Sequence, residues 1–360
     1  MKVLVVGDWH SELHEEAVHT ALLGLGHESI RFGWHQYFKA GQRFPFLSEV
    51  AGKAQNKYML GPLVSRLNAD LRRLALSTRP DALFVYRGTH VLPSTLKTLK
   101  DNLPGMVLVG YNNDDPFSPQ YPMWKWRHFL RGVPLYDLVL AYRQHNLNDF
   151  ERCGAREVRL LRSWFIPSRN RPVVLNARQR RDFECDVVFA GHFEDDGRLA
   201  LLEEIARQGW RLRIFGPGHE WDELLKNSPV LNSQGPVRQV WGDEYNAALC
   251  GAKVALCFFS RLNRDTYTRR CFEIPASGTV LASEYSDDLA HMFEDGREAI
   301  LFRNADDMVS KIKGLLNDDE QRQAIATAGR MRVWRDGHDV GSRMQNVVNW
   351  IQEISSGRVE

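Results

Sequence analysis

The feature that most constrains the fold is an alternation of short apolar runs with helical patterns, which occurs twice along the chain. It begins with an apolar run at 2–6, closed by Gly7, then a helical pattern over 12–23 and a second strand around Ile30. This order is typical of the βαβ unit of a parallel sheet. Further apolar runs follow at 81–86, 106–111, 137–142 and 158–161. The first part of the chain is therefore predicted to be a doubly wound α/β domain.

The alternation stops and restarts near the middle of the chain. Residues 166–181 are rich in Pro, Asn and Arg and have no clear periodicity, which indicates a linker. The cycle then restarts with apolar runs at 186–190, 211–215, 253–259 and 279–282. A length of 360 residues suits two domains. We therefore expect an N-terminal domain over 1–165 and a second domain over 182–340.

Composition excludes several classes of protein. The chain is 43% hydrophobic and 26% charged, as in ordinary globular proteins, and no stretch approaches the roughly 20 apolar residues of a membrane span. The apolar run at 3–6 is too short for a signal peptide, so we expect a cytoplasmic protein. Five cysteines without paired spacing indicate reduced thiols, and the histidines show no metal-ligand spacing. We expect no bound metal.

Charge is distributed unevenly along the sequence. Residues 1–170 contain 22 Lys and Arg against 15 Asp and Glu, a net charge of +7, whereas the remainder contains 25 against 30, a net charge of −5. A basic first half favours an anionic acceptor or an anionic surface such as phospholipid headgroups, although an imbalance spread over all faces explains it equally well. A pI near 8.2 and the absence of a nucleic-acid module argue against a nucleic-acid partner.

The strongest functional signal is residues 260–284, which lie between two apolar strands. This segment holds two acidic residues that flank a pair of arginines, in the order Asp265, Arg269, Arg270 and Glu273. A carboxylate that opens a helix just past a strand suits ribose hydroxyls, because ionised oxygens accept strong hydrogen bonds. Adjacent arginines can grip a diphosphate bidentately. The pattern predicts half of a nucleotide-sugar site; the alternative is an ion-paired helix start.

The same segment resembles the donor-binding loop of GT-B glycosyltransferases, particularly the bacterial spore-maturation-like or family 1 group. The form RxFEIPAxG carries the resemblance, through Arg270, Phe272, Glu273, Pro275 and Gly278. The resemblance implies an α/β protein of two doubly wound Rossmann-like domains facing a cleft. It also implies a final helix, residues 341–360, that packs back on the N-terminal domain.

The resemblance further implies roles for individual residues. Glu273 would hold the ribose and Asp265 would contact the donor sugar, while Arg198 and Arg270 would stabilise the departing diphosphate. GT-B enzymes generally neutralise this group with basic side chains and helix dipoles, so the resemblance implies neither metal nor cofactor. The glycine-rich segment of retaining family 4 enzymes is replaced here by residues 266–270, which leaves the stereochemical outcome open.

Two further loops of the second domain follow predicted strands. Gly191 ends one strand and Arg198 starts the next helix, which suits an anion pocket at a helix N-terminus. A plain turn with a surface arginine is the alternative. Gly216 and Gly218 follow the next strand and would let the backbone approach a flat ligand, and the resemblance places this loop near the nucleotide base. A simple turn explains these two glycines equally well.

In the first domain, His10 follows the first strand and is our first candidate for the catalytic base, with Asp8 as a possible orienting group and His14 as a weaker candidate. The alternative is a histidine that binds only backbone or water. Asp114 and Asp115 follow the strand at 106–111 and could bind acceptor hydroxyls or act as base. A turn closed by Asx hydrogen bonds is the alternative for both aspartates.

Residues 121–131 interleave aromatic and cationic side chains. Such a segment could rest on a bilayer interface as a peripheral membrane contact, stack on acceptor sugars, or simply pack on its own domain.

Together these features and the resemblance predict a metal-independent glycosyltransferase that moves a sugar from a nucleotide diphosphate sugar to a hydroxyl of a glycan or glycolipid acceptor. The resemblance implies that it acts in bacterial surface polysaccharide synthesis. The alternatives are a nucleotide-sugar epimerase of the same fold and a non-catalytic sugar-binding or coat-associated protein.

Overall fold

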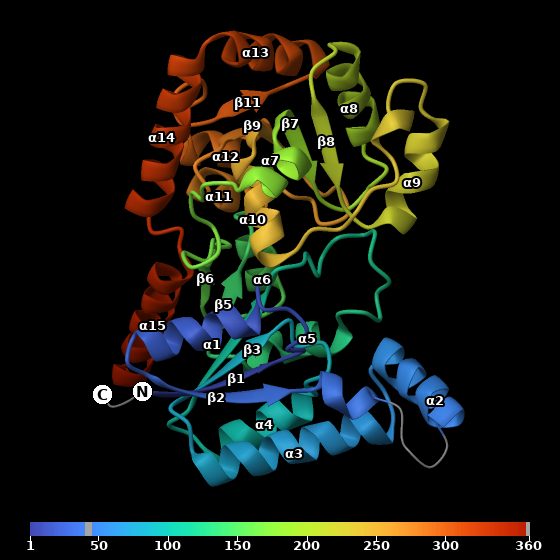
Figure 1. The fold of residues 1–360 in the computed structure, drawn as a ribbon. Helices are drawn as coiled ribbons and strands as arrows, with labels where there is room; N and C mark the ends of the chain where they lie inside the picture. The colour runs from blue at the N-terminus through green and yellow to red at the C-terminus, as the bar shows by residue number, and fades with distance from the viewer. Residues whose placement is uncertain (40–44, 358–360) are drawn as a thin grey trace. The chain divides into compact units, whose positions relative to one another are not determined.

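The computed structural model in Figure 1 describes residues 1–39 and 45–357, with residues 45–48 described for their backbone alone. The chain divides into two units. Unit 1 consists of Met1–Arg162 together with Val340–Glu360, and unit 2 consists of Ser163–Asp339. Each unit is built on one parallel sheet with helices between its strands, so the predicted class of two doubly wound α/β domains is confirmed.

Unit 1 contains a six-stranded parallel sheet in the order β2-β1-β3-β4-β5-β6. Its strands are β1 (Lys2–Gly7), β2 (Glu28–Gly33), β3 (Ala82–Tyr86), β4 (Val107–Asn112), β5 (Leu138–Ala141) and β6 (Val158–Leu160). Every residue of β3, β4 and β5 is buried, as expected for central strands covered on both faces. The chain leaves β1 toward β2 on one side and returns to β3 on the other. The topological switch point of unit 1 therefore lies at the carboxyl ends of β1 and β3.

Helices cover both faces of this sheet. Figure 1 shows α3 and α4 on one face and α1 and α15 on the other. The helix α15 contacts α1, so the last described helix belongs to unit 1. Pro62 starts α3 after Gly61, whose φ of +114° breaks the helical pattern there. The helical elements of unit 1 are α1 (Glu15–Gly24), η1 (His35–Phe38), α2 (Pro45–Tyr58), α3 (Pro62–Thr78), α4 (Pro93–Asn102), α5 (Arg127–Gly132), η2 (Val133–Leu135), α6 (Asn146–Arg152) and α15 (Val340–Ser356).

Unit 2 contains a five-stranded parallel sheet in the order β11-β10-β9-β7-β8. Its strands are β7 (Cys185–Ala190), β8 (Leu212–Phe215), β9 (Ala252–Cys257), β10 (Val280–Glu284) and β11 (Ile300–Phe302). The chain passes from β7 to β8 on one side and to β9 on the other, so the switch point lies at the carboxyl ends of β7 and β9. The helical elements are α7 (Ala177–Phe183), α8 (Arg198–Arg207), α9 (Gly218–Asn227), η3 (Asn232–Gln234), α10 (Gly242–Cys250), α11 (Arg270–Ala276), α12 (Asp287–Met292), α13 (Ala305–Asn317) and α14 (Asp319–Arg335).

Residues 166–181, predicted as a linker, fall within unit 2. They lead into α7, whose start is fixed by a capping box in which Asn176 and Gln179 bond each other's backbone N–H groups. At the other end of unit 2, the Phe165 N–H donates to the carbonyl of His338 at 3.0 Å. The chain therefore enters and leaves unit 2 through neighbouring segments.

Within the described residues, no helix combines the length and the apolar character needed to cross a membrane.

Candidate functional site

The helix α11 places a buried acid close to the switch point of unit 2. The side chain of Glu273 is only 5% exposed, and its Oε2 accepts a hydrogen bond from the Tyr245 hydroxyl at 2.9 Å. Burial raises the pKa of the Glu273 carboxyl above its ordinary value, while Arg269, the Tyr245 hydroxyl and Arg270 oppose the rise. The acid and the two arginines predicted from residues 260–284 therefore lie within electrostatic reach of one another.

Arg270, the first residue of α11, directs its guanidinium at the end of β7. Its Nη1 donates to the carbonyl of Ala190 at 3.4 Å, and its Nε has no hydrogen-bond partner among the described residues. A Cβ at Gly191 would lie only 2.8 Å from Nη1, so glycine at this position makes room for the arginine. Arg269 lies over the Trp164 ring, 5.5 Å from its centroid. Arg270 is therefore a buried cation with a donor still to be satisfied.

The two glycines of the loop after β8 pack against protein atoms. A Cβ at Gly216 would lie 2.3 Å from the Gly191 carbonyl oxygen, and the Trp221 indole donates to that same oxygen at 3.0 Å. A Cβ at Gly218 would lie 2.8 Å from Asp222 Oδ2. Gly216 therefore lets the loops after β7 and β8 approach each other closely, and Gly218 leaves room for the Asp222 side chain of its own helix.

Arg198 starts α8, as its position in the sequence indicates, but its guanidinium is engaged within its own loop. It makes a bidentate pair with Asp196, with Nε at 2.8 Å from Oδ1 and Nη2 on Oδ2. Its Nη1 donates to the carbonyl of His192 at 2.5 Å, and the side chain is 2% exposed. Arg198 therefore shapes the loop after β7, whereas Arg270 keeps an Nε without a hydrogen-bond partner among the described residues.

Asp265 closes a turn at the end of β9. Its N–H donates to the Ser260 carbonyl at 2.9 Å, and its Oδ2 accepts from the Ser260 N–H at 3.4 Å. The Ser260 hydroxyl in turn donates to Glu194 Oε2 at 2.9 Å, which ties this turn to the loop after β7. The Phe259 N–H donates to Glu284 Oε2 at 2.6 Å, so the end of β10 is tied to the same turn.

These loops enclose a cavity of about 410 Å³ at the carboxyl ends of the strands, lined in part by Asp196, Arg261, Glu284 and Arg303.

Two residues of this region were missed in the sequence analysis. Glu284 ends an apolar strand, a position that could have been noticed in the sequence. Nothing in the local pattern indicates that Tyr245 reaches Glu273, because 28 residues separate them.

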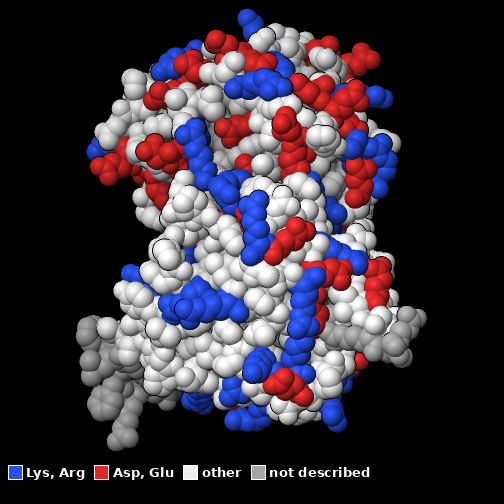
Figure 2. Space-filling model, turned by 180° about the vertical axis from the view of Figure 1, so that it is seen from behind, with Lys and Arg blue, Asp and Glu red and all other residues white. Residues whose placement is uncertain are grey.

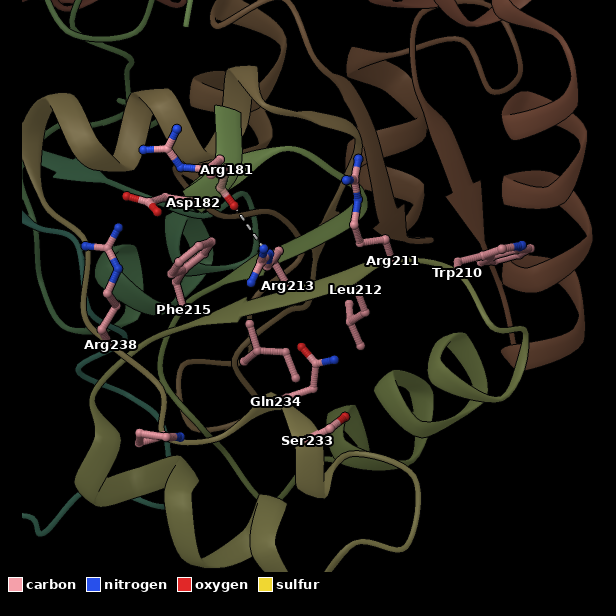
Figure 3. Close-up of a pocket in the computed structure, with 12 residues that line it drawn as sticks. Arg181, Asp182, Trp210, Arg211, Leu212, Arg213, Phe215, Ser233, Gln234 and Arg238 are labelled. Carbon is pink, nitrogen blue, oxygen red and sulfur yellow. Dashed lines mark hydrogen bonds between the residues drawn. The ribbon is translucent and has the colours of Figure 1, made fainter. Parts of the chain in front are cut away.

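A second hollow of unit 2, of about 470 Å³, runs along the edge strand β8 and is lined by several arginines. Figure 3 shows Arg181, Arg213 and Arg238 around Phe215, with the Arg213 guanidinium donating to the Arg181 carbonyl at 3.1 Å. This hollow extends along the length of β8 and is not confined to the carboxyl end of that strand. None of residues 260–284 lines it. We therefore do not assign it to the site.

In unit 1, the candidate base His10 lies exposed after β1. Its ring centroid is 5.3 Å from that of His35. Asp8, expected to orient His10, instead has its Oδ1 at 3.4 Å from His35 Nδ1. The ring of His14 lies 5.2 Å from that of Tyr86.

The two candidate aspartates at the end of β4 have different surroundings. Asp114 pairs with the guanidinium of Arg87, a residue whose φ of +64° is unusual for a side chain other than glycine. Asp115 is fully buried, and its Oδ1 accepts from the Phe117 N–H and the Asn146 amide, both at 3.0 Å. Asp115 therefore forms the Asx turn that was the alternative prediction, whereas Asp114 forms an ion pair with Arg87.

Glu15 is a residue that the sequence reasoning missed. It is buried at the start of α1, and its Oε1 accepts from the Asp8 N–H at 2.9 Å. A Cβ at Gly7 would lie 2.1 Å from this oxygen, so glycine there admits the carboxyl. Burial raises the pKa of Glu15 to about 7, despite hydrogen bonds from its own backbone and that of Asp8. A carboxyl that titrates near neutrality at a strand end is a candidate for proton transfer.

Within residues 1–39 and 45–357, no three His, Cys, Asp or Glu side chains are grouped as ligands for a metal ion.

Comparison with known families identifies the kind of protein to which this site is similar. Residues 198–349 match the model of a family described as glycosyl transferase-like. The matched residues include the whole of α11 and the turn before it. No curated protein sequence matches the chain.

Solved structures resemble the chain over nearly its full length. Sucrose-phosphate synthase from Thermosynechococcus elongatus has a TM-score of 0.71 at 12% identity, covering 99% of this chain and 100% of that one. Anabaena HepE in complex with UDP-glucose has a TM-score of 0.67 at 12% identity, covering 98% and 100%. The trehalose-phosphate synthase of Burkholderia xenovorans, in complex with glucose-6-phosphate, has a TM-score of 0.66 at 12% identity, covering 98% and 100%. The chain therefore has the GT-B fold of these proteins.

Proposed function

We propose that this chain, a glycosyl transferase-like protein with the GT-B fold, moves a sugar from a nucleotide diphosphate sugar to a hydroxyl of a glycan or glycolipid acceptor. The observation that carries the proposal is the arrangement on α11, where Arg270 and Arg269 accompany the buried Glu273 inside the segment that matches the family. The structures of HepE with UDP and with UDP-glucose support a nucleotide-sugar donor.

The chemistry follows from these groups. An acceptor hydroxyl attacks the anomeric carbon, the bond from that carbon to the diphosphate oxygen breaks, and the nucleotide diphosphate leaves with its charge. Arg270, with an unsatisfied Nε, stabilises that charge as it develops. Glu273 accepts hydrogen bonds from the ribose, and Asp265 holds the turn beside the donor sugar.

The hydroxyl proton passes to a base of unit 1. We retain His10 and Asp114 as candidates and add Glu15, whose pKa is raised to about 7 by burial. Asp115 is not proposed, because its Oδ1 already accepts two hydrogen bonds, from the Phe117 N–H and the Asn146 amide.

The first test is a thermal-shift screen with UDP-, GDP-, dTDP-, ADP- and CMP-sugars, since a ligand that binds only the folded state raises its stability. The best donor is then titrated by calorimetry into the wild type and Glu273→Gln. We expect the substitution to weaken donor binding by about 10- to 100-fold, because hydrogen bonds to charged groups contribute about 1.5–3 kcal/mol. Glu244→Gln, on the exposed part of α10, is the matched control.

Unchanged donor affinity in Glu273→Gln would assign Glu273 a purely structural role and remove the basis of the proposal. Incubation with the donor alone gives a second check. An epimerised sugar nucleotide formed without any acceptor would instead support the epimerase alternative.

The setting in bacterial surface polysaccharide synthesis and a cytoplasmic location belong to the same proposal. For peripheral contact with a membrane, residues 121–131 offer Met123, which is 95% exposed, whereas Trp126 and Phe129 are buried and pack on their own unit.

A further inference from the structure

A cavity of about 310 Å³ in unit 1 lies at the switch point of its sheet. Its walls include Asp8, directly after β1, and Arg87, directly after β3, so it opens at the carboxyl ends where ligands bind in open α/β sheets. The volume is within the range of about 300–1,000 Å³ that small-molecule sites have. The proposed function assigns no ligand to this cavity.

Its walls carry three cations, of which Lys125 is the most informative. The half-buried ammonium lies 3.9 Å from the centroid of the Tyr121 ring and 5.0 Å from that of Trp126. Among the described residues it makes no ion pair. Burial lowers the pKa of Lys125, while Asp114 raises it and Arg87 lowers it further. A cation withdrawn from water without an ionic partner is costly, and an anion in the cavity would offset that cost.

Arg87 adds a second cation with spare donor capacity. One of its terminal nitrogens pairs with Asp114, but its buried Nε has no hydrogen-bond partner within the described residues. Its left-handed backbone conformation costs energy and holds this side chain at the end of β3. Lys57, at the end of α2, is the third cation.

The negative and neutral groups do not cancel this charge. Asp8 is the carboxylate that lines the cavity, and it lies within ion-pair distance of His35. Burial lowers the pKa of His90 to about 4, so its ring is neutral at pH 7. The walls therefore hold three cations and one carboxylate, and the positive charge still exceeds the negative charge when Asp114, the ion-pair partner of Arg87, is included.

The remaining walls suit a sugar ring. Trp34, Trp124 and Trp126 all line the cavity, and Trp124 packs on Tyr58 with ring centroids 5.5 Å apart. This wall is fixed by His128, which bonds the Met59 carbonyl at 2.9 Å and so ties the segment before α5 to the end of α2. Rigid aromatic faces bury the apolar faces of sugars, while cations at their edges select charged substituents.

We propose that this cavity binds the acceptor, and that the acceptor is an anionic saccharide whose phosphate monoester or carboxylate group is held by Lys125 and Arg87. The inference rests on the proposed function and narrows its acceptor to a charged sugar. Figure 2 shows on one face of unit 1, in the lower half, a group of Lys and Arg side chains without an acidic neighbour, and elsewhere on that face basic side chains next to acidic ones.

The test measures binding rather than activity. Glucose, mannose and galactose, their 6-phosphates, the corresponding uronic acids and inorganic phosphate are each titrated by calorimetry into the full chain with UDP present. We expect at least one sugar phosphate or uronic acid to bind at least 10-fold more tightly than its neutral parent and than phosphate alone. Lys125→Gln should reduce that affinity by about 5- to 20-fold, and Lys125→Arg should preserve the preference for the charged sugar.

Lys97→Gln, an exposed lysine on α4, is the control and should leave all affinities unchanged. The thermal midpoint of each variant shows that it is folded. Equal binding of neutral and charged sugars, no binding of any charged sugar, binding of phosphate as tight as that of sugar phosphates, or full affinity in Lys125→Gln would each overturn the inference. If any of these occurs while nucleotide sugars still bind through Glu273, the proposed function stands and only the acceptor assignment fails.

Discussion

At the scale of single residues, burial decides which charged groups can act on a ligand. Arg198 and Arg270 both start helices after strands of unit 2, yet Arg198 is satisfied by Asp196 and Arg270 retains an unpartnered Nε. In the sequence the two arginines occupy equivalent positions, each at the start of a helix that follows a strand, so position alone does not distinguish their roles. Whether a nearby acid consumes the guanidinium depends on loop geometry, which spacing alone does not determine.

Glu15 gives a pH-dependent prediction at this scale. Burial raises its pKa from 4.5 to about 7 in the folded protein, so the folded state binds a proton more tightly than the unfolded state. Its contribution to stability is fully present below pH 4.5 and is lost as the pH rises through 7. Glu15→Gln keeps an oxygen for the Asp8 N–H and cannot ionise. We expect it to be more stable than the wild type by about 3 kcal/mol at pH 8 and similar to it at pH 4.5.

Urea unfolding of both proteins between pH 4.5 and 8 measures this difference. The exposed Glu12→Gln serves as control and should show no such trend. A stability difference that stays constant across this pH range would show that the Glu15 pKa is ordinary.

At the scale of elements, the long buried strands were the most predictable part of the fold. The runs at 81–86 and 106–111 correspond to β3 and β4, and their continuous apolar character follows from burial on both faces. The three-residue β11 and the helix α14 were not predicted. In α14 the buried residues Ile325, Gly329 and Val333 lie four residues apart on one face, but only two of them carry an apolar side chain larger than glycine, so the apolar stripe is weak in the sequence.

The loop glycines of unit 2 allow a second prediction. Gly216→Ala would place a Cβ 2.3 Å from the Gly191 carbonyl oxygen and close to the Trp221 indole, so the two loops must separate. We expect a loss of about 1–3 kcal/mol in stability, as for other overpacked sites, together with weaker donor binding because Arg270 reaches the same loop.

Gly314→Ala is the matched control, because this glycine lies in the helix α13 with nothing within 4 Å of an added Cβ. It should stabilise the protein by about 0.5–1 kcal/mol. Thermal unfolding and donor titration of both variants measure the contrast. Equal stability of the two variants would mean that the loops after β7 and β8 are not packed as described.

The candidate site was predictable in its residue types more than in its geometry. The acid and arginines of α11 were identified because they follow a buried strand. Glu15 was not, because a glutamate in the first turn of a helix is ordinarily solvated. Arg87 was also missed, because the sequence of a strand does not reveal that the residue after it takes a left-handed backbone conformation.

At the scale of the whole molecule, the helix α15 belongs to unit 1 although all of unit 2 precedes it in the sequence. Its apolar face, which includes Met344, Val347 and Ile351, is buried. Met344→Ala should therefore destabilise unit 1 by about 2–5 kcal/mol through the cavity that it leaves.

The exposed Gln352→Ala, on the same helix, should change stability by less than about 0.5 kcal/mol. Hydrogen exchange resolves the effect by segment, and we expect faster exchange in α1 and α15 of Met344→Ala than in β7 and β9. Acceleration confined to unit 2 would contradict the assignment of α15 to unit 1.

The same connectivity has a consequence for biosynthesis. Unit 1 lacks α15 until all 177 residues from Ser163 to Asp339 have been translated. At about 5–20 residues per second, the surface of α1 that α15 covers stays bare on the ribosome for roughly 9–35 s. During that interval a nascent chain would be most dependent on chaperones, and the first unit to emerge would be the last to mature.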